Sequence, residues 1–153
     1  MTEPFRVRLR VRGYELDING HLNQAVYLQY AEHARWELVR AAGVSQEKLL
    51  AAGLGPVVLE TTIRYRRELR DGDEVDVSCS FGWGDRKTFR VSQDIRLTDG
   101  TLAAEVRGVG GLLSLTERRL VADPAGRFRV LASAPALLGL DGDAGGAAAF
   151  AGK

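Results

Sequence analysis

One change in the spacing of apolar residues constrains the fold of this chain most strongly. Between residues 26 and 41 apolar side chains recur at helical spacing, whereas from Gly55 onward they alternate with polar ones, as in strands. The helical positions are Val26, Tyr30, Ala34, Leu38 and Ala41. Each element therefore has a single apolar side to bury. This predicts an α+β fold, in which a curved antiparallel sheet of about five strands wraps round one long helix.

Capping and turn residues bound these elements. Asn23 is a suitable N-cap for the long helix, and Gly43 is a plausible residue just beyond its end. A shorter helix is predicted over 45–52, capped by Ser45. The predicted strands cover 5–12, 57–65, 74–83, 89–97 and 101–115. Asp99-Gly100 between two alternating runs predicts a hairpin, and Gly108, Gly110 and Gly111 suggest a bulge or a close backbone approach.

Composition is that of an ordinary globular protein. The 153 residues are 45% hydrophobic and 27% charged, which fits one domain, predicted at 1–138. The Gly/Ala-rich tail at 139–153 is predicted to be disordered. A net charge of +1 argues against a nucleic-acid-binding protein.

The chain also lacks the features of secreted, membrane or metal-binding proteins. Cys79 is the only cysteine, which rules out an intrachain disulfide and a cysteine-based metal site. The sequence contains neither a secretory signal pattern nor an apolar run of membrane-spanning length. We therefore expect a cytoplasmic protein with no membrane partner, no metal and no cofactor.

A carboxylate stands directly before the long helix. Asp17 is followed by a Gly20-His21 turn, the Asn23 cap and then Gln24, the first residue of the predicted helix. A helix start offers unpaired N–H groups and a partial positive charge, which suit an oxyanion or a bound carbonyl oxygen. A neighbouring carboxylate can serve as nucleophile or base in acyl chemistry. An isolated Asp before a glycine turn is more often only a turn residue.

The complete pattern is more specific than its parts. It reads Asp17-x-x-Gly20-His21-x-Asn23-x-x-x-Tyr27-Leu28-x-Tyr30-x-Glu32-x-Ala34-Arg35. It resembles the signature of hotdog-fold acyl-CoA thioesterases of the 4-hydroxybenzoyl-CoA thioesterase (YbgC-like) group, and the similarity extends to about Pro135. The resemblance implies the hotdog fold, a curved antiparallel sheet around one long helix, and hydrolysis of an acyl-CoA to free acid and CoA.

The resemblance also assigns roles to residues. It makes Asp17 the catalytic carboxylate, either as a nucleophile or as a base that activates water. It makes the backbone N–H of Gln24 the donor to the thioester oxygen, with His21 and Asn23 as further candidates at the site. The commoner family pattern has a second asparagine where this chain has Gln24. A backbone donor survives that substitution, whereas a role for a second Asn side chain does not.

Substrate contacts and partners are also expected. Tyr27 and Val58 are candidates to line the acyl pocket, with Val57, Leu59, Phe81 and Trp83 as further apolar candidates. Basic side chains suit the phosphates of CoA, namely Arg64, Arg66, Arg86 and Lys87. In the family the site lies between two subunits, which implies a homodimer or a tetramer built as a dimer of dimers.

Two other functions remain open. The same site could cleave an acyl group from an acyl carrier protein, because the thioester end of that substrate is identical. A catalytically silent hotdog module that binds acyl thioesters is the non-enzymatic alternative. Glu32 and Arg35 are expected to form an intrahelical ion pair rather than to take part in chemistry.

Overall fold

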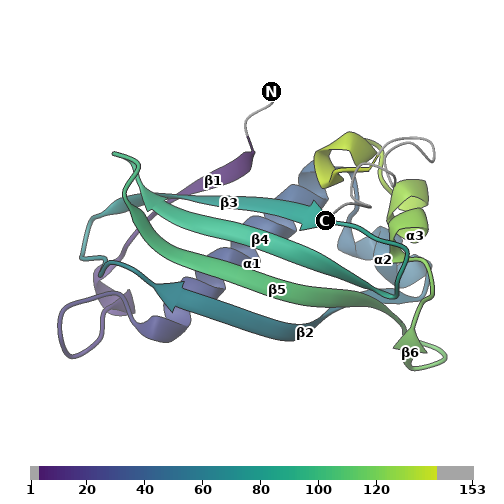
Figure 1. Cartoon of the computed structure of the whole chain (residues 1–153), viewed down its shortest axis with the longest axis horizontal. Coiled ribbons are helices and arrows are strands. Elements are labelled where there is room, and N and C mark those ends of the chain that lie inside the picture. The colour runs from purple at the N-terminus through teal and green to yellow at the C-terminus, as the bar shows by residue number, and fades with distance from the viewer. Residues whose placement is uncertain (1–3, 141–153) are drawn as a thin grey trace.

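Helix α1 (Gln24–Ala41) lies across one face of an antiparallel sheet that curls around it (Figure 1). The computed structural model describes residues 4–140. The five long strands are β1 (Phe5–Arg10), β2 (Leu54–Tyr65), β3 (Glu74–Gly82), β4 (Thr88–Leu97) and β5 (Leu102–Ser114). Their order is β1-β3-β4-β5-β2, and a short β6 (Arg119–Leu120) pairs with β5. The predicted α+β class, with about five strands around one long helix, is confirmed.

The predicted helix boundaries are also found. Helix α2 (Gln46–Ala51) begins after Ser45, whose hydroxyl accepts the Lys48 N–H at 3.1 Å. Gly43 has a φ of +89°, and an added Cβ would meet the Ser133 side chain at 1.9 Å. Only glycine fits there, because the left-handed conformation and the close neighbour both exclude a side chain.

The inner face of α1 and the inner faces of the strands form the core. Two clusters of buried apolar side chains pack on the helix, one that includes Leu38 and one that includes Ala34. Leu38, Ala34 and Ala31 are fully buried. Each large aliphatic side chain buried in this way contributes about 1.5–3 kcal/mol relative to exposure, so the sheet holds α1 firmly in place.

The glycines of β5 permit the predicted close approach. An added Cβ at Gly110 would meet the Phe89 ring at 2.9 Å and the Val57 carbonyl oxygen at 3.2 Å. On the neighbouring strand β2 the pairing register shifts between Val58 and Glu60, which is a β-bulge. A bulge of this kind bends its strand, and this one lies at Val58, which lines a cavity with residues from the middle of α1.

Besides the short β6, two further elements follow β5 that the sequence analysis did not predict. Helix α3 (Pro124–Leu131) is capped by Asp123, whose carboxylate accepts the Gly126 N–H at 3.1 Å. A 3₁₀ turn, η2 (Pro135–Leu138), follows, and Leu140 is fully buried in the core. The Asp-Pro pair at the start of α3 is a helix-start signal that could have revealed it.

The predicted tail lies almost entirely outside the described residues, since 141–153 are not among them. Its predicted disorder stays a prediction. Across residues 4–140, none of the helices has the length and apolar character needed to cross a membrane.

Candidate active site at the start of helix α1

The segment between β1 and α1 forms a tight turn that carries Asp17. A 3₁₀ turn, η1 (Gly13–Glu15), leads into it, and an isolated bridge joins Leu16 to Leu22. Within the turn the Asp17 N–H donates to the His21 carbonyl at 2.7 Å, and the Gly20 N–H donates to the Asp17 carbonyl at 3.0 Å. The backbone around Asp17 is therefore fixed from both sides.

The Asp17 carboxylate is half-buried and only partly engaged. Its Oδ1 accepts the backbone N–H of Asn19 at 2.8 Å and that of His21 at 3.1 Å. Within residues 4–140, Oδ2 accepts no hydrogen bond. Asp17 therefore does act as a turn residue, through the hydrogen bonds to Oδ1. These bonds hold the carboxylate in one orientation and leave Oδ2 available for chemistry.

Helix α1 starts next to this carboxylate. The Asn23 side chain accepts the Ala25 N–H at 2.9 Å, so Asn23 is the N-cap as predicted. Inside the described part of the chain the Gln24 N–H has no acceptor, whereas the Gln24 carbonyl accepts the Tyr65 hydroxyl at 2.9 Å. The first residue of the helix therefore presents a donor at the positive end of the helix dipole.

Asp17 and Gln24 line the same open cleft, of about 280 Å³. The cleft is bounded by Asp17, His21, Leu22, Gln24, Tyr27, Tyr65, Arg66, Arg67 and Glu68. Of the predicted catalytic residues, the structure brings Asp17, His21 and Gln24 together here, and Asn23 stands beside them as the cap. The cleft can hold a polar group between a carboxylate and a helix start.

Tyr27 lies in this cleft rather than in an apolar pocket. Its side chain is only 3% exposed, and its hydroxyl donates to the Arg67 carbonyl at 3.2 Å. Its ring packs edge-to-face against Tyr65, with ring centroids 5.0 Å apart. Tyr27 thus fixes the end of β2 against the start of α1.

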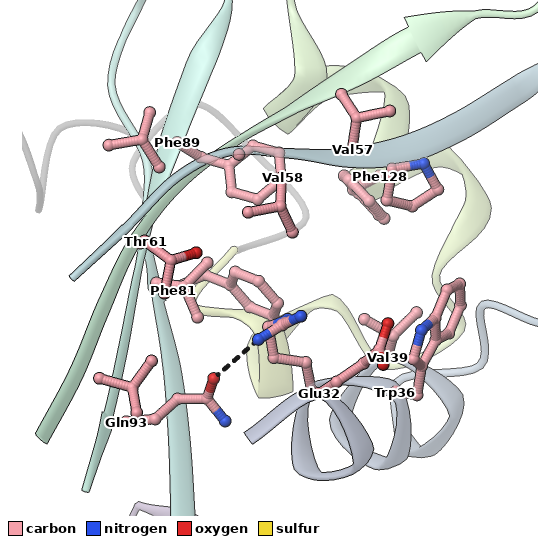
Figure 2. Close-up of a pocket in the computed structure, with 17 residues that line it drawn as sticks. Glu32, Trp36, Val39, Val57, Val58, Thr61, Phe81, Phe89, Gln93 and Phe128 are labelled. Carbon is pink, nitrogen blue, oxygen red and sulfur yellow. Dashed lines mark hydrogen bonds between the residues drawn. The ribbon is translucent and has the colours of Figure 1, made fainter. Parts of the chain in front are cut away.

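A second, mostly apolar cavity of about 140 Å³ lies further along α1 (Figure 2). Val58, a candidate for the acyl pocket, lines this cavity together with Val57 and Phe81. Because β2 runs antiparallel to α1, the Tyr65 end of β2 meets the start of the helix, and Val57 and Val58 face its middle. The cleft and the cavity therefore follow one seam between α1 and β2.

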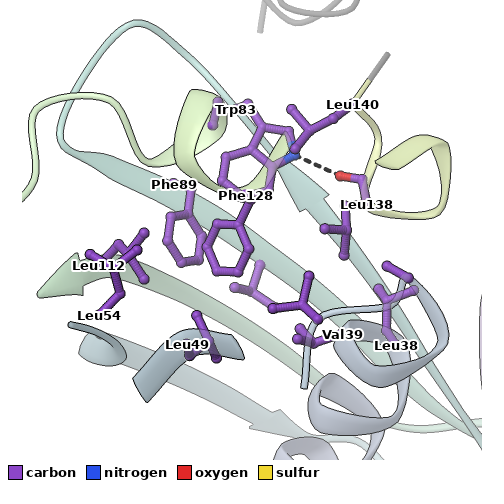
Figure 3. Packing of buried hydrophobic residues seen from close by; sticks show 14 of the residues in the cluster. Leu38, Val39, Leu49, Leu54, Trp83, Phe89, Leu112, Phe128, Leu138 and Leu140 are labelled. Carbon is purple, nitrogen blue, oxygen red and sulfur yellow. Dashed lines mark hydrogen bonds between the residues drawn. The ribbon is translucent and has the colours of Figure 1, made fainter. Parts of the chain in front are cut away.

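Trp83 does not line this cavity, contrary to expectation. It is 3% exposed, and its indole N–H donates to the Leu138 carbonyl at 2.6 Å (Figure 3). It packs instead between Phe89 and Phe128, with ring centroids at 4.9 and 5.6 Å. Phe128 does line the cavity and went unnoticed in the sequence, because α3 was not predicted.

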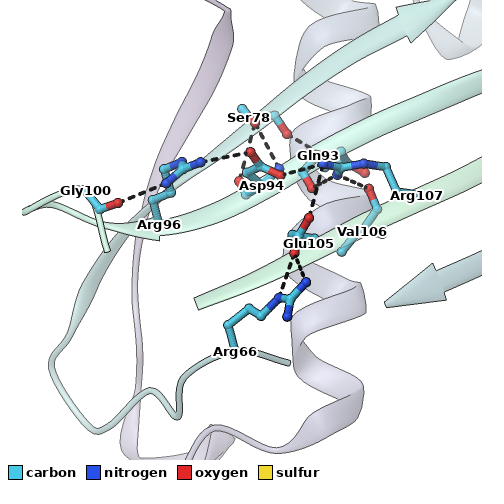
Figure 4. Close-up of polar contacts among 9 residues, drawn as sticks. All are labelled: Arg66, Ser78, Gln93, Asp94, Arg96, Gly100, Glu105, Val106 and Arg107. Atoms are coloured by element: carbon cyan, nitrogen blue, oxygen red, sulfur yellow. Dashed lines mark hydrogen bonds and ion pairs between the residues drawn. The ribbon is translucent and has the colours of Figure 1, made fainter. Parts of the chain in front are cut away.

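The predicted basic residues fall in two places. Arg66 lines the cleft, but its guanidinium pairs with Glu105 at 2.7 Å, in a network on the outer face of the sheet (Figure 4). Arg64 is exposed near the same end of β2. Arg86 and Lys87 are exposed on the hairpin between β3 and β4, which is the sheet end away from Asp17. Within one chain, the four predicted basic residues therefore do not lie together.

Other polar residues behave differently from their sequence interpretation. Among the described residues Glu32 and Arg35 form no ion pair; the Arg35 guanidinium instead donates to the Gln93 side-chain oxygen at 3.2 Å. Tyr30, one of the apolar positions of the predicted helix, also donates its hydroxyl to Glu15 at 2.6 Å. Glu68 and Tyr65 of the cleft were missed, because residues distant in sequence gave no local signal.

Comparison with known proteins identifies the family. A model of the thioesterase-like superfamily matches residues 11–134, a span that includes the turn, α1 and all strands after β1. The chain belongs to the thioesterase-like superfamily. This thioesterase-like chain is also 31% identical, over 101 residues, to long-chain acyl-CoA thioesterase FadM of Escherichia coli, covering 65% of this chain and 76% of FadM.

Two further similarities concern length and fold. This thioesterase-like chain is 36% identical over 79 residues to the chloroplastic acyl-acyl carrier protein thioesterase ATL3 of Arabidopsis thaliana, covering 52% of this chain but only 42% of ATL3. The crystal structure of the hypothetical protein AQ1494 from Aquifex aeolicus superposes with a TM-score of 0.75 at 28% identity, covering 84% of this chain and 99% of that one. The predicted hotdog fold is confirmed.

Proposed function

We propose that this protein hydrolyses acyl-CoA thioesters to a free acid and CoA. The observation that carries the proposal is the cleft lined by both Asp17 and Gln24, which pairs a carboxylate with the first N–H of a helix. The first is a group that can attack or activate water, and the second is a group that can stabilise an oxyanion. A preorganised donor of this kind is typically worth about 3 kcal/mol of transition-state stabilisation.

The thioester carbonyl oxygen lies against the Gln24 N–H in this mechanism. Asp17 either attacks the carbonyl carbon, giving an anhydride that water then hydrolyses, or removes a proton from the water that attacks. In both routes the C–S bond breaks and the thiolate of CoA leaves and takes up a proton. Neither route needs a metal, because a thioester carbonyl is more electrophilic than that of an oxygen ester. His21 and Asn23 support the turn and the cap from which these groups act.

The comparisons support the thioester class and leave the carrier as a proposal. FadM is named a long-chain acyl-CoA thioesterase and ATL3 an acyl-acyl carrier protein thioesterase. We favour CoA because the FadM match covers most of that protein, whereas the ATL3 match covers less than half. The Asp17-to-Arg35 pattern supports placement in the 4-hydroxybenzoyl-CoA (YbgC-like) group. Neither name determines which acyl group the substrate of this chain carries.

Edge strand β2 favours a homodimer. Of the two sheet edges, β1 carries outward charged side chains such as Arg8 and Arg10, which oppose pairing with another strand. Strand β2 instead exposes Val58, Leu59 and Tyr65, at 58%, 49% and 47% of their surface. An apolar edge with unpaired backbone groups fits a second copy of the same strand. Assembly of two such dimers into a tetramer, and a cytoplasmic location, stay predictions.

Antiparallel pairing of two β2 strands would bring the two pockets together. A two-fold axis near the middle of β2 sets the Tyr65 end of one copy beside the Leu54 end of the other. The Asp17 cleft of each subunit then adjoins the apolar cavity of its partner. The same arrangement offers a route by which Arg86 and Lys87 of one subunit approach CoA bound at the other, while Arg64 and Arg66 lie on the cleft side.

Thiol release from a panel of acyl-CoAs tests the proposal, with Asp17→Asn and Asp17→Ala beside wild type. Asparagine keeps an oxygen for the Asn19 and His21 N–H groups, so it removes the charge and preserves the turn. We expect both variants to lose roughly 10²- to 10⁴-fold in kcat. Asp85→Asn, exposed on the β3–β4 hairpin, is the control and should match wild type.

Three outcomes would contradict parts of the proposal. Equal rates for wild type and both Asp17 variants would remove Asp17 from the mechanism. Release from acyl carrier protein but from no CoA ester would favour the carrier-protein alternative. Tight binding of both ester classes without any release would favour the silent module.

A further inference from the structure

The apolar cavity contains an unexpected pair of polar residues. Its walls are largely aromatic and aliphatic, including Trp36, Phe81, Phe89 and Phe128. Yet Arg35 from α1 and Gln93 from β4 also line it. Figure 2 shows the Gln93 side chain at the cavity. Gln93 interrupts an otherwise apolar run of inward-facing positions in β4 and is only 1% exposed.

Gln93 is held in a single orientation by its own hydrogen bonds. Its amide nitrogen donates to the Ala31 carbonyl at 2.8 Å, on the inner face of α1. That orientation leaves its side-chain oxygen to accept from Arg35 at 3.2 Å. A buried Gln therefore fixes a guanidinium at the wall of the cavity rather than simply filling the core.

The Arg35 guanidinium is partly withdrawn from solvent, and its neighbours do little to compensate its positive charge. Burial lowers the pKa of Arg35, although it stays a cation at any physiological pH. Among the described residues its hydrogen-bonding partner is the neutral Gln93 amide, which uses one of five donors. The nearby Cys79 thiol is uncharged, because burial raises its pKa to about 12.

One anion borders the same cavity. Glu32 lies one helical turn before Arg35, lines the cavity and is exposed to solvent, without forming an ion pair with Arg35. The cavity thus offers a fixed donor and a nearby acceptor whose charges balance. A hydrocarbon occupant would desolvate Arg35 further without supplying a partner, which is unfavourable. A carboxylate would gain Arg35 but meet Glu32.

We propose that this cavity binds acyl groups that carry a hydroxyl group away from the thioester. The hydroxyl accepts a hydrogen bond from Arg35 and donates one towards Glu32, while the carbon chain packs on the aromatic walls. Gln93 acts as a positioning residue for Arg35. The proposal rests on the proposed thioesterase function and names the substrate class of that site.

Matched acyl-CoA series test it directly. The substrates are hexanoyl-CoA and octanoyl-CoA with their ω-hydroxy and ω-carboxy counterparts, assayed for kcat/KM. We expect wild type to favour at least one ω-hydroxy ester over its plain counterpart by roughly tenfold or more, the usual value of a hydrogen bond to a charged group. Arg35→Met should abolish this preference, so that each ω-hydroxy ester is cleaved no better than its plain counterpart.

Two variants sharpen the test. Glu32→Gln should raise the rate on the ω-carboxy esters, since it removes the opposing charge and keeps an acceptor. Arg40→Met, exposed on the same helix and paired with Glu37, removes an equal charge away from the cavity and should leave all ratios unchanged. Melting curves of the three variants exclude a general loss of folding.

The outcomes separate this inference from the proposed function. Cleavage of plain esters with no hydroxyl preference, or an equal loss on all esters in Arg35→Met, would overturn the hydroxyl proposal and leave the thioesterase intact. Highest rates on ω-carboxy esters would make Arg35 an anion site instead. With no cleavage of any ester, the proposed function fails, and calorimetric binding of the ω-hydroxy and plain esters to wild type and Arg35→Met still tests the cavity.

Discussion

The hydroxyl of Tyr30 donates a hydrogen bond of 2.6 Å to the carboxylate of Glu15, and this contact fastens the turn that carries Asp17 to helix α1. Glu15 also accepts the Asn23 N–H through its backbone carbonyl at 2.9 Å, so a single residue joins both ends of the turn. Burial and the adjacent carboxylate raise the pKa of Tyr30, which keeps its hydroxyl a donor.

Tyr30→Phe should loosen this turn. Removing the hydroxyl leaves the Glu15 carboxylate short of a charged hydrogen bond worth about 1.5–3 kcal/mol. We expect a loss of that order in the free energy of unfolding, measured by urea titration, together with a lower kcat at unchanged KM. Tyr14→Phe is the matched control, since Tyr14 is 82% exposed in the same segment. Similar effects of both substitutions would contradict this role of Tyr30.

Asn23→Ala should affect both stability and catalysis. It removes the N-cap acceptor of α1, which typically lowers the free energy of unfolding by about 1 kcal/mol. Fraying of the first turn would also move the Gln24 N–H, so kcat for thioester cleavage should fall. Ser45→Ala removes the corresponding cap of α2 and should lower stability without changing kcat. A kcat unaffected by Asn23→Ala would argue against the helix start as the oxyanion site.

Gly110→Ala should destabilise the sheet where β5 meets Phe89. The added methyl would stand 2.9 Å from the Phe89 ring and 3.2 Å from the Val57 carbonyl oxygen. Overpacking of this kind lowers the free energy of unfolding by about 1–3 kcal/mol. An added Cβ at Gly84 meets nothing within 4 Å, so Gly84→Ala should be close to neutral in the same melt. A neutral Gly110→Ala would mean that Phe89 moves freely.

The pair between β1 and β3 predicts a pH dependence. Arg8 contacts both carboxylate oxygens of Asp76, at 2.9 and 3.0 Å, and lowers the pKa of Asp76 below its ordinary 3.8. A carboxyl whose folded pKa is depressed adds stability above its unfolded pKa and loses it as pH falls through the folded pKa. The advantage of wild type over Asp76→Asn in urea titrations should therefore be full near neutrality and shrink below pH 3.8. A constant difference across that range would contradict it.

Local patterns account for most of what could be predicted. The Asn23 cap, the Gly43 end and the Asp99-Gly100 hairpin depend on a few neighbouring residues, so the sequence contains their signals in full. Helix α3 was missed because its pattern is short, although Asp123-Pro124 marks its start. Trp83 was misplaced because alternation along β3 gives only the side of the sheet, and burial by α3 and η2 decided the rest.

The candidate site divides in the same way. Asp17 and Gln24 are close in sequence, so their proximity at the helix start could be predicted from the turn alone. Glu68 and Tyr65 reach the cleft only through the return of β2 along α1. Arg35 and Gln93 are far apart in the chain, and the expected neighbour of Arg35 on the helix, Glu32, turned out not to be its partner.

The antiparallel course of α1 and β2 has a genetic consequence. In the proposed dimer each reaction centre combines the Asp17 cleft of one subunit with the cavity of the other. A subunit with Asp17→Asn and a subunit with Arg35→Met would then be defective in different halves of the site. When the two variants are co-expressed, each mixed dimer should contain one intact reaction centre out of two. Each variant is impaired by itself, but together they should restore cleavage of an ω-hydroxyacyl-CoA.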